Sequence, residues 1–197
     1  MKNRFSATNS QGFTILELMI ATTVFSVILL ISTIGIVYVG RIYYKGKTII
    51  RTQNVTRSVT DSISQSIQYG GSDAIGTLPD IPAVIPVTGA TFCIGNSKYT
   101  YSPNRVTSTT FGLILDANNS SGCTPASVAA GGKELLGDGM RLTRFIITKS
   151  STSDYTIKIS VGYGADDVLV GGKCVLGAGG QFCATSILDT TVRRRLK

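Results

Sequence analysis

The chain starts with a short polar segment and continues into an unbroken apolar run. From Phe13 to Val39 there are 27 residues, and Glu17 is the only charged residue among them. About 20 consecutive apolar residues are enough for a helix to cross a bilayer, so the run is a candidate membrane span. No proline occurs before Pro79. This absence predicts one continuous helix from about Phe13 to about Tyr69.

Beyond Arg41 the pattern of the predicted helix changes. Apolar residues recur every four positions among Thr, Ser, Gln and Arg, at Val55, Val59, Ile63 and Ile67. This spacing places one apolar stripe on an otherwise polar helix, which therefore needs a surface to pack against. Gly70 and Gly71 then provide a typical helix stop.

After a proline-rich connection at 78–86, the pattern takes the two-residue period of strands. The clearest example is YTIKISVGY at 155–163, in which large apolar residues alternate with polar or small ones. The other candidates are strands RLTRFIITK at 141–149 and TSTTFGLILD at 107–116, the turn LGDG at 136–139, and a closing strand within FCATSILDTTVRRRLK at 182–197. We therefore predict an α+β fold, in which the second half of one long N-terminal helix packs on an antiparallel sheet.

These patterns divide the chain into four segments, the last of which is long enough for one domain of ordinary size. They are a polar leader at 1–12, an apolar transmembrane and assembly helix at 13–40, an amphipathic continuation of the helix at 41–71, and a β-rich globular region at 72–197 that contains all four cysteines.

The net charge of +8 comes from 19 Lys and Arg against 11 Asp and Glu. Such a balance attracts anionic partners without distinguishing among them. The candidates for anionic-partner contacts are Arg41, Lys45, Lys47 and Arg51 after the apolar run and Arg193, Arg194 and Arg195 near the C-terminus. The first group is interpreted as a neck that faces lipid headgroups and acidic neighbours, and the second as a solvated terminus. DNA is an alternative partner for both, although no recognition motif supports it.

Four cysteines follow the apolar run, which indicates two disulfides in an oxidising compartment; reduced, buried thiols are the alternative. Three pairings are open. The pairing Cys93 to Cys123 and Cys174 to Cys183 is favoured, because glycines 177, 179 and 180 between the last two suit a tight loop. There is no CxxC pair and no His, so a zinc site is not expected.

Catalytic patterns are absent from the sequence. It has no His, no G-x-S-x-G, no phosphate-binding loop and no carboxylate pair. The loop DANNSSG at 116–122 lacks the glycine and the final acid of a calcium loop, so it is interpreted as a turn. We expect no enzymatic activity, no cofactor and no metal.

Gly12, Phe13, Thr14 and Glu17, behind a short basic leader and before the apolar run, resemble the class III signal of type IV pilins and type II secretion pseudopilins. The resemblance implies that a prepilin peptidase cuts between Gly12 and Phe13 and methylates the new N-terminus at Phe13. It also implies that the Glu17 carboxylate pairs with the terminal amine of a neighbouring subunit during assembly. A costly buried charge in the apolar run would then have both a partner and a role.

Downstream, LLGDGMRLTRFIIT, the glycine-bounded Cys174 and Cys183, and the arginine-bearing last strand are similar to minor pilins and minor pseudopilins. The implied function is that of a minor structural subunit of a type IV pilus or related filament. Its partners would be other subunits through the apolar helix, the inner-membrane assembly platform, and membrane lipid before assembly. The chain would cross the cytoplasmic membrane once, with its N-terminus inside and its C-terminal domain outside, and then enter an extracellular or periplasmic filament.

Three alternatives to this function remain open. The chain could be a major pilin, or a filament-displayed adhesin or DNA-binding pilin. It could also be a membrane-anchored surface domain that never polymerises. That alternative predicts an uncut leader and a Glu17→Ala variant that behaves like the wild type.

Overall fold

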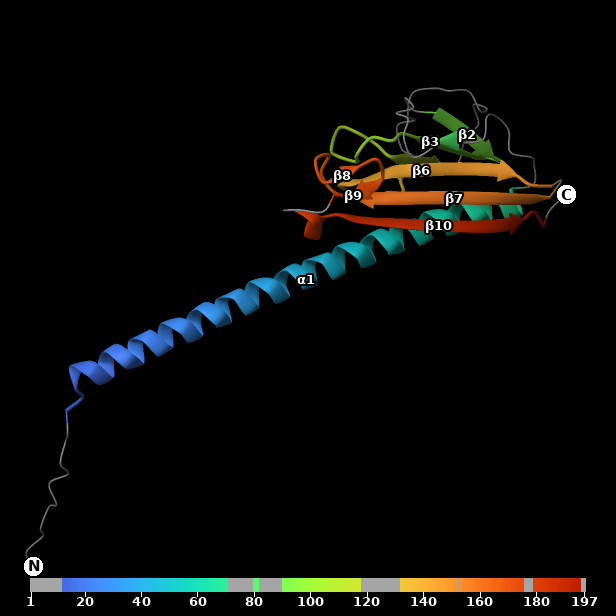
Figure 1. Cartoon of the computed structure of the whole chain (residues 1–197). Coiled ribbons are helices and arrows are strands. Elements are labelled where there is room, and N and C mark those ends of the chain that lie inside the picture. The colour runs from blue at the N-terminus through green and yellow to red at the C-terminus, as the bar shows by residue number, and fades with distance from the viewer. Residues whose placement is uncertain are drawn as a thin grey trace, which may run out of the picture. The chain divides into compact units, whose positions relative to one another are not determined.

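The structure is a computed structural model, and it describes residues 12–70, 80–81, 90–117, 132–151, 153–175 and 179–195. One helix is followed by antiparallel strands, as Figure 1 shows, which confirms the predicted α+β class. The elements are α1 (Ile15–Tyr69), β1 (Asp80–Ile81), β2 (Ala90–Ile94), β3 (Ser97–Tyr101), β4 (Leu113–Asp116), β5 (Lys133–Glu134), β6 (Met140–Lys149), β7 (Asp154–Tyr163), β8 (Leu169–Val170), β9 (Lys173–Cys174), the 3-10 helix η1 (Gly180–Phe182) and β10 (Ala184–Arg193).

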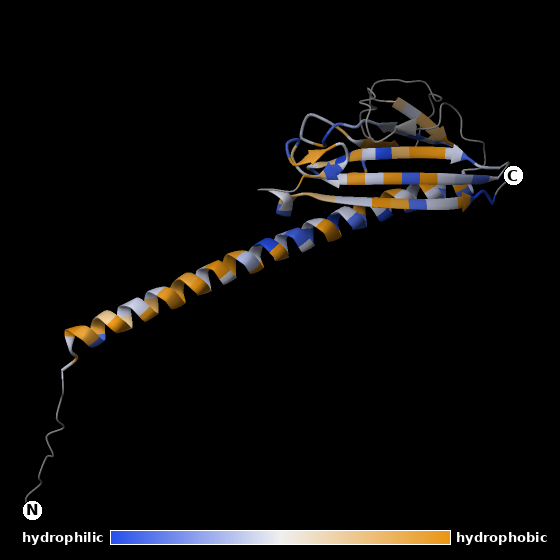
Figure 2. Ribbon diagram, viewed as in Figure 1, coloured by the Kyte–Doolittle hydropathy of each residue, from blue (hydrophilic) through white to orange (hydrophobic). Residues whose placement is uncertain are grey.

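The chain divides into two compact units, the first ending at Ile42 and the second running from Tyr43 to the C-terminus. In the first unit the large apolar side chains of α1 are exposed, and Figure 2 shows their apolar colouring along this part of the helix. Within the described residues, α1 is the one helix whose length and composition suffice to cross a membrane. The predicted helix is confirmed to within two residues at its start.

In the second unit α1 buries the predicted stripe. Val59, Ile63 and Ile67 are buried, and Val55 packs half-buried against the same core. The pattern of apolar residues did not reveal a second buried row, which consists of Thr52, Thr56 and Thr60. Each of these hydroxyls donates a hydrogen bond of 2.8 to 2.9 Å to the carbonyl four residues earlier. Because the helix itself satisfies these hydroxyls, the threonines can be buried without other polar partners.

The described strands form two four-stranded antiparallel sheets rather than the single sheet that the sequence indicated. Their orders are β1-β6-β7-β10 and β2-β3-β4-β5, and β8 and β9 make a separate two-stranded ribbon. Strands β6 and β7 were predicted almost residue for residue, and β10 pairs with β7 along its whole length. The second sheet was missed because the hairpin of β2 and β3 was not recognised in TFCIGNSKYTY, although Gly95 and Asn96 form a two-residue turn there.

The predicted strand at 107–116 is only half right, since β4 begins at Leu113. The Thr107 hydroxyl accepts hydrogen bonds from the backbone amides of Thr109 and Thr110, at 3.3 and 3.2 Å. Side chains of this type compete with strand pairing by making such local turns. The threonine-rich beginning of the segment therefore forms a turn, and only its apolar end joins the sheet.

The two sheets and α1 share one core of stacked aromatic and branched side chains. Phe92 of β2 stacks on Tyr99 of β3 with ring centroids 4.8 Å apart, and Phe145 of β6 lies 5.6 Å from Phe92. The Tyr99 hydroxyl and the Ser66 hydroxyl of α1 share a 2.7 Å hydrogen bond. Burial raises the pKa of Tyr99, and hydrogen bonds with Ser66 and Ser62 oppose that effect in part. This bond ties the helix to the sheet that the sequence did not reveal.

The C-terminal end of α1 fits against the turn between β2 and β3. Gly95 has a φ of 57°, and a Cβ added to it would collide with the backbone of Gly70. A Cβ on Gly70 would lie 2.5 Å from the carbonyl oxygen of Ser66 and 3.0 Å from Ile94 Cγ2. Only two glycines allow this close backbone approach.

We predict that Tyr99→Phe lowers stability near neutral pH by about 1 kcal/mol, because Ser66 loses a buried partner. The raised pKa adds a second effect. In the wild type, Tyr99 loses its proton at a lower pH in the unfolded state than in the folded state. Its contribution to stability is therefore fully present below about pH 10 and decreases as the pH rises toward the pKa of the folded state. Tyr99→Phe has no phenol to ionise, so it should not show this part of the loss of stability at high pH. Denaturant midpoints of the full-length chain in detergent between pH 7 and 11 measure both effects, with exposed Tyr44→Phe as the control. Parallel pH profiles for wild type and Tyr99→Phe would contradict the assignment.

Candidate functional site

The bond predicted to be cleaved lies in exposed backbone just before α1. Gly12 and Phe13 are exposed and non-helical, and 80% of the Phe13 surface is accessible. A Cβ added to Gly12 would meet no atom within 4 Å. A protease could therefore reach this bond without unwinding the helix that follows.

The carboxylate of Glu17 has a partner in its own chain, which the sequence interpretation missed. The Thr14 amide donates to Glu17 Oε2 at 3.1 Å, and the Glu17 amide donates to Thr14 Oγ1 at 3.3 Å. The Thr14 hydroxyl also donates to the same carboxylate oxygen at 3.1 Å. This reciprocal pair is a capping box, and T-x-x-E before an apolar run is its sequence signature. The capping box satisfies helix-terminal amides and places the negative charge at the positive end of the helix dipole.

The four basic residues predicted as a neck are all exposed. Arg41 lies in the first unit, and Lys45, Lys47 and Arg51 lie in the second. Within the part of the chain that the structure describes, no ion pair joins them to an acid. The structure therefore leaves these charges available to an external partner, while the nature of that partner stays a prediction.

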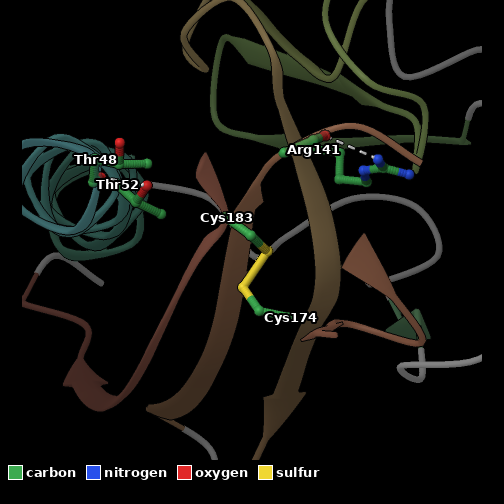
Figure 3. The surroundings of a disulfide bond; sticks show 6 residues. Thr48, Thr52, Arg141, Cys174 and Cys183 are labelled. Carbon is green, nitrogen blue, oxygen red and sulfur yellow. Dashed lines mark hydrogen bonds between the residues drawn. A yellow bond between two sulfur atoms is a disulfide. The ribbon is translucent and has the colours of Figure 1, made fainter. Parts of the chain in front are cut away.

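A disulfide joins Cys174 of β9 to Cys183, with 5.7 Å between the Cα atoms, as the sequence favoured. Figure 3 shows it near Thr48 and Thr52 of α1. In the same surroundings Arg141 donates to the carbonyl of Gly164 at 3.1 Å and makes a 2.6 Å ion pair with Asp166. These contacts attach the segment after β7 to the start of β6. Cys93 of β2 is also disulfide-bonded, and its predicted partner, Cys123, lies outside the described residues.

The C-terminal arginines are not simply a solvated terminus. The Arg195 amide donates to the carbonyl of Gln68 at 3.2 Å, and its guanidinium donates to the Tyr69 hydroxyl at 3.5 Å. The last turn of α1 has no basic residue of its own, so Arg195 supplies the cation that suits this end of the helix dipole. The Arg194 amide donates to the carbonyl of Ser153, and Arg193 lies 3.8 Å from the Asp154 carboxylate. A role for these arginines in binding an anionic partner stays a prediction.

Comparison with protein families identifies the N-terminal segment. Residues 7–33 match the family model described as the prokaryotic N-terminal methylation motif. The chain carries the class III signal of type IV pilins and pseudopilins. No curated protein and no solved structure matches the chain. The motif covers 27 of 197 residues, so it identifies the N-terminal segment.

The methylation motif contains Gly12, Phe13, Thr14 and Glu17, so the capping box lies inside it. A class III signal implies processing by a prepilin peptidase and assembly with pilin-type subunits in general. It points to a structural subunit rather than an enzyme. Together with the apolar helix, it indicates membrane anchoring followed by entry into a filament.

We predict that Thr14→Val weakens the start of α1 by about 1 kcal/mol, because the N-cap hydroxyl is lost. Thr14→Ser keeps the hydroxyl and serves as the matched control. Amide hydrogen exchange of residues 15–18 in the full-length chain in detergent should be faster in Thr14→Val and unchanged in Thr14→Ser. Equal protection in wild type and Thr14→Val would show that the capping box does not hold the helix start.

Proposed function

We propose that this protein is a minor structural subunit of a type IV pilus or a related pseudopilus. The observation that carries the proposal is the methylation motif, whose Gly12–Phe13 bond is exposed directly before an unbroken apolar helix. The minor rank rests on the resemblance that the sequence around Cys174 and Cys183 and the arginine-bearing last strand carries to minor pilins and minor pseudopilins.

In this proposal a prepilin peptidase cuts between Gly12 and Phe13 and methylates the Phe13 amine. Thr14 and its amide stay with the mature chain, so the capping box with Glu17 survives cleavage. The new amine then lies one residue before the N-cap, close in sequence to the carboxylate of its own subunit. The chain crosses the cytoplasmic membrane once, with residues 13–40 as the span and the region from about 72 onward outside.

The capping box gives Glu17 a partner before assembly. A lone carboxylate in the middle of a membrane span costs about 2.5 to 3.5 kcal/mol, and near the end of the span, where Glu17 lies, it costs less but still needs a partner. The hydrogen bonds from Thr14 reduce that cost while the subunit waits in the membrane. During assembly the amine of a neighbouring subunit adds a positive charge to the same carboxylate, and subunits in the correct register satisfy both charges.

Mass spectrometry of the N-terminal peptide from the native, membrane-associated protein tests the processing step. We expect a chain that begins at Phe13 and carries one methyl group on its amine. A Gly12→Val variant should keep the leader, because the residue before the cut is changed. An intact leader on the wild-type protein would favour a membrane-anchored domain that does not polymerise.

Assembly is tested by Glu17→Ala in a strain that produces the filaments. The variant should be processed and reach the membrane, but its amount in sheared filaments should fall at least tenfold. Asp189→Ala removes an exposed carboxylate from β10 in the globular region and controls for loss of charge. The ratio of this subunit to the most abundant one in wild-type filaments decides between minor and major rank. Filaments with normal amounts of Glu17→Ala would overturn the assembly role.

A further inference from the structure

One exposed face of α1 in the second unit combines a hollow, an apolar floor and a basic rim. The hollow has a volume of about 600 Å³ and is called the neck hollow here. Its lining residues are Tyr43, Gly46, Lys47, Ile50, Arg51, Asn54 and Val55. They recur at three- and four-residue intervals, which places them on one side of the helix. A Cβ added to Gly46 would meet no atom within 4 Å, so the missing side chain opens the hollow.

The rim of the neck hollow carries uncompensated positive charge. Lys47 and Arg51 are both exposed and stand four residues apart, a spacing at which like charges repel on a helix. Lys45 lies two positions before Lys47 on another side of the helix, outside the lining of the hollow, and the first acid of α1 in this unit is Asp61. No acid pairs with Lys45, Lys47 or Arg51 among the described residues. An anion from outside the chain would relieve this repulsion.

The floor and its surroundings are apolar and aromatic rather than polar. Tyr43 is 67% exposed, Tyr44 is 57% exposed and Ile50 is 59% exposed. The two tyrosine rings meet edge to face with centroids 6.0 Å apart. Tyrosine and lysine side chains of this kind, with an apolar body and a polar tip, suit the boundary between lipid and water.

We propose that the neck hollow binds the headgroup of an anionic phospholipid. Lys47 and Arg51 would contact the phosphate oxygens, and Tyr43, one turn nearer the apolar span, would contact the first carbons of the lipid. A nucleic-acid backbone would match the charge but would leave the apolar floor without a partner. The inference rests on the proposed function, because the apolar span precedes this segment directly in sequence and brings it to the headgroup layer.

Such a site would hold the subunit at a fixed depth in the membrane before assembly. The site uses a charge that the β-sheet core does not need, since Lys47 is exposed. Arg51 is less suitable for mutation, because its guanidinium lies where a Cβ on Gly137 would approach it at 3.3 Å. Lys47 and Gly46 therefore provide the cleanest test.

The test is native mass spectrometry of the full-length chain in detergent, titrated separately with dioleoylphosphatidylglycerol and dioleoylphosphatidylcholine. Wild type should retain phosphatidylglycerol in preference to phosphatidylcholine. Lys47→Gln should weaken phosphatidylglycerol binding by about fivefold, whereas Lys45→Gln, which removes a charge outside the lining of the hollow, should change it less. Arg57→Gln with Lys133→Gln removes two exposed charges elsewhere and should leave binding unchanged. Gly46→Leu fills the hollow at constant charge, favours the helix, and should also weaken binding.

Three results would overturn the site: equal binding of the two lipids, unchanged binding in both Lys47→Gln and Gly46→Leu, or displacement of the lipid by an equal concentration of a DNA duplex at physiological salt. Thermal melting of each variant shows whether the fold is retained. Leader cleavage and filament incorporation are scored separately in cells. Failed lipid binding with normal processing rejects the lipid site alone, whereas lipid binding by a chain with an uncut leader rejects the proposed function alone.

Discussion

The packing of the second half of α1 against the aromatic core is the interaction on which the rest of the second unit depends. Val59, Ile63 and Ile67 are buried in this core, and both four-stranded sheets contribute side chains to it. The hydrophobic effect is not directional. The hydrogen bond between Tyr99 and Ser66 and the close approach of Gly70 and Gly95 therefore fix where along the core the helix sits. Apolar burial therefore holds the helix in place, and the polar and steric contacts set its register.

Polar groups on α1 are largely satisfied by the helix itself. In the second half, the buried threonine hydroxyls donate to backbone carbonyls of the helix. At the start, the capping box gives the Glu17 carboxylate a backbone amide as its partner. The basic neck differs, because its charges have no acid nearby among the described residues. This contrast separates groups that serve the fold from groups that are available to a partner.

Much of the candidate site could be predicted from the sequence, because its residues are close neighbours along the chain. The cleavage motif, the apolar run and the capping signature all lie within a few helical turns, where spacing alone decides which groups meet. The capping box was overlooked although its T-x-x-E pattern was present. The favoured Cys174–Cys183 bond was also a local inference, because nine residues with several glycines close easily.

The sequence by itself determined the long helix, its apolar stripe, strands β6 and β7, and the methylation motif, because each follows from a period or a short motif. Only the tertiary structure decided that the strands form two sheets and that Thr52, Thr56 and Thr60 are buried. It also decided that Arg195 meets the end of α1 across more than a hundred residues of sequence. Contacts between distant segments depend on how surfaces fit, and no local pattern of residues encodes that fit.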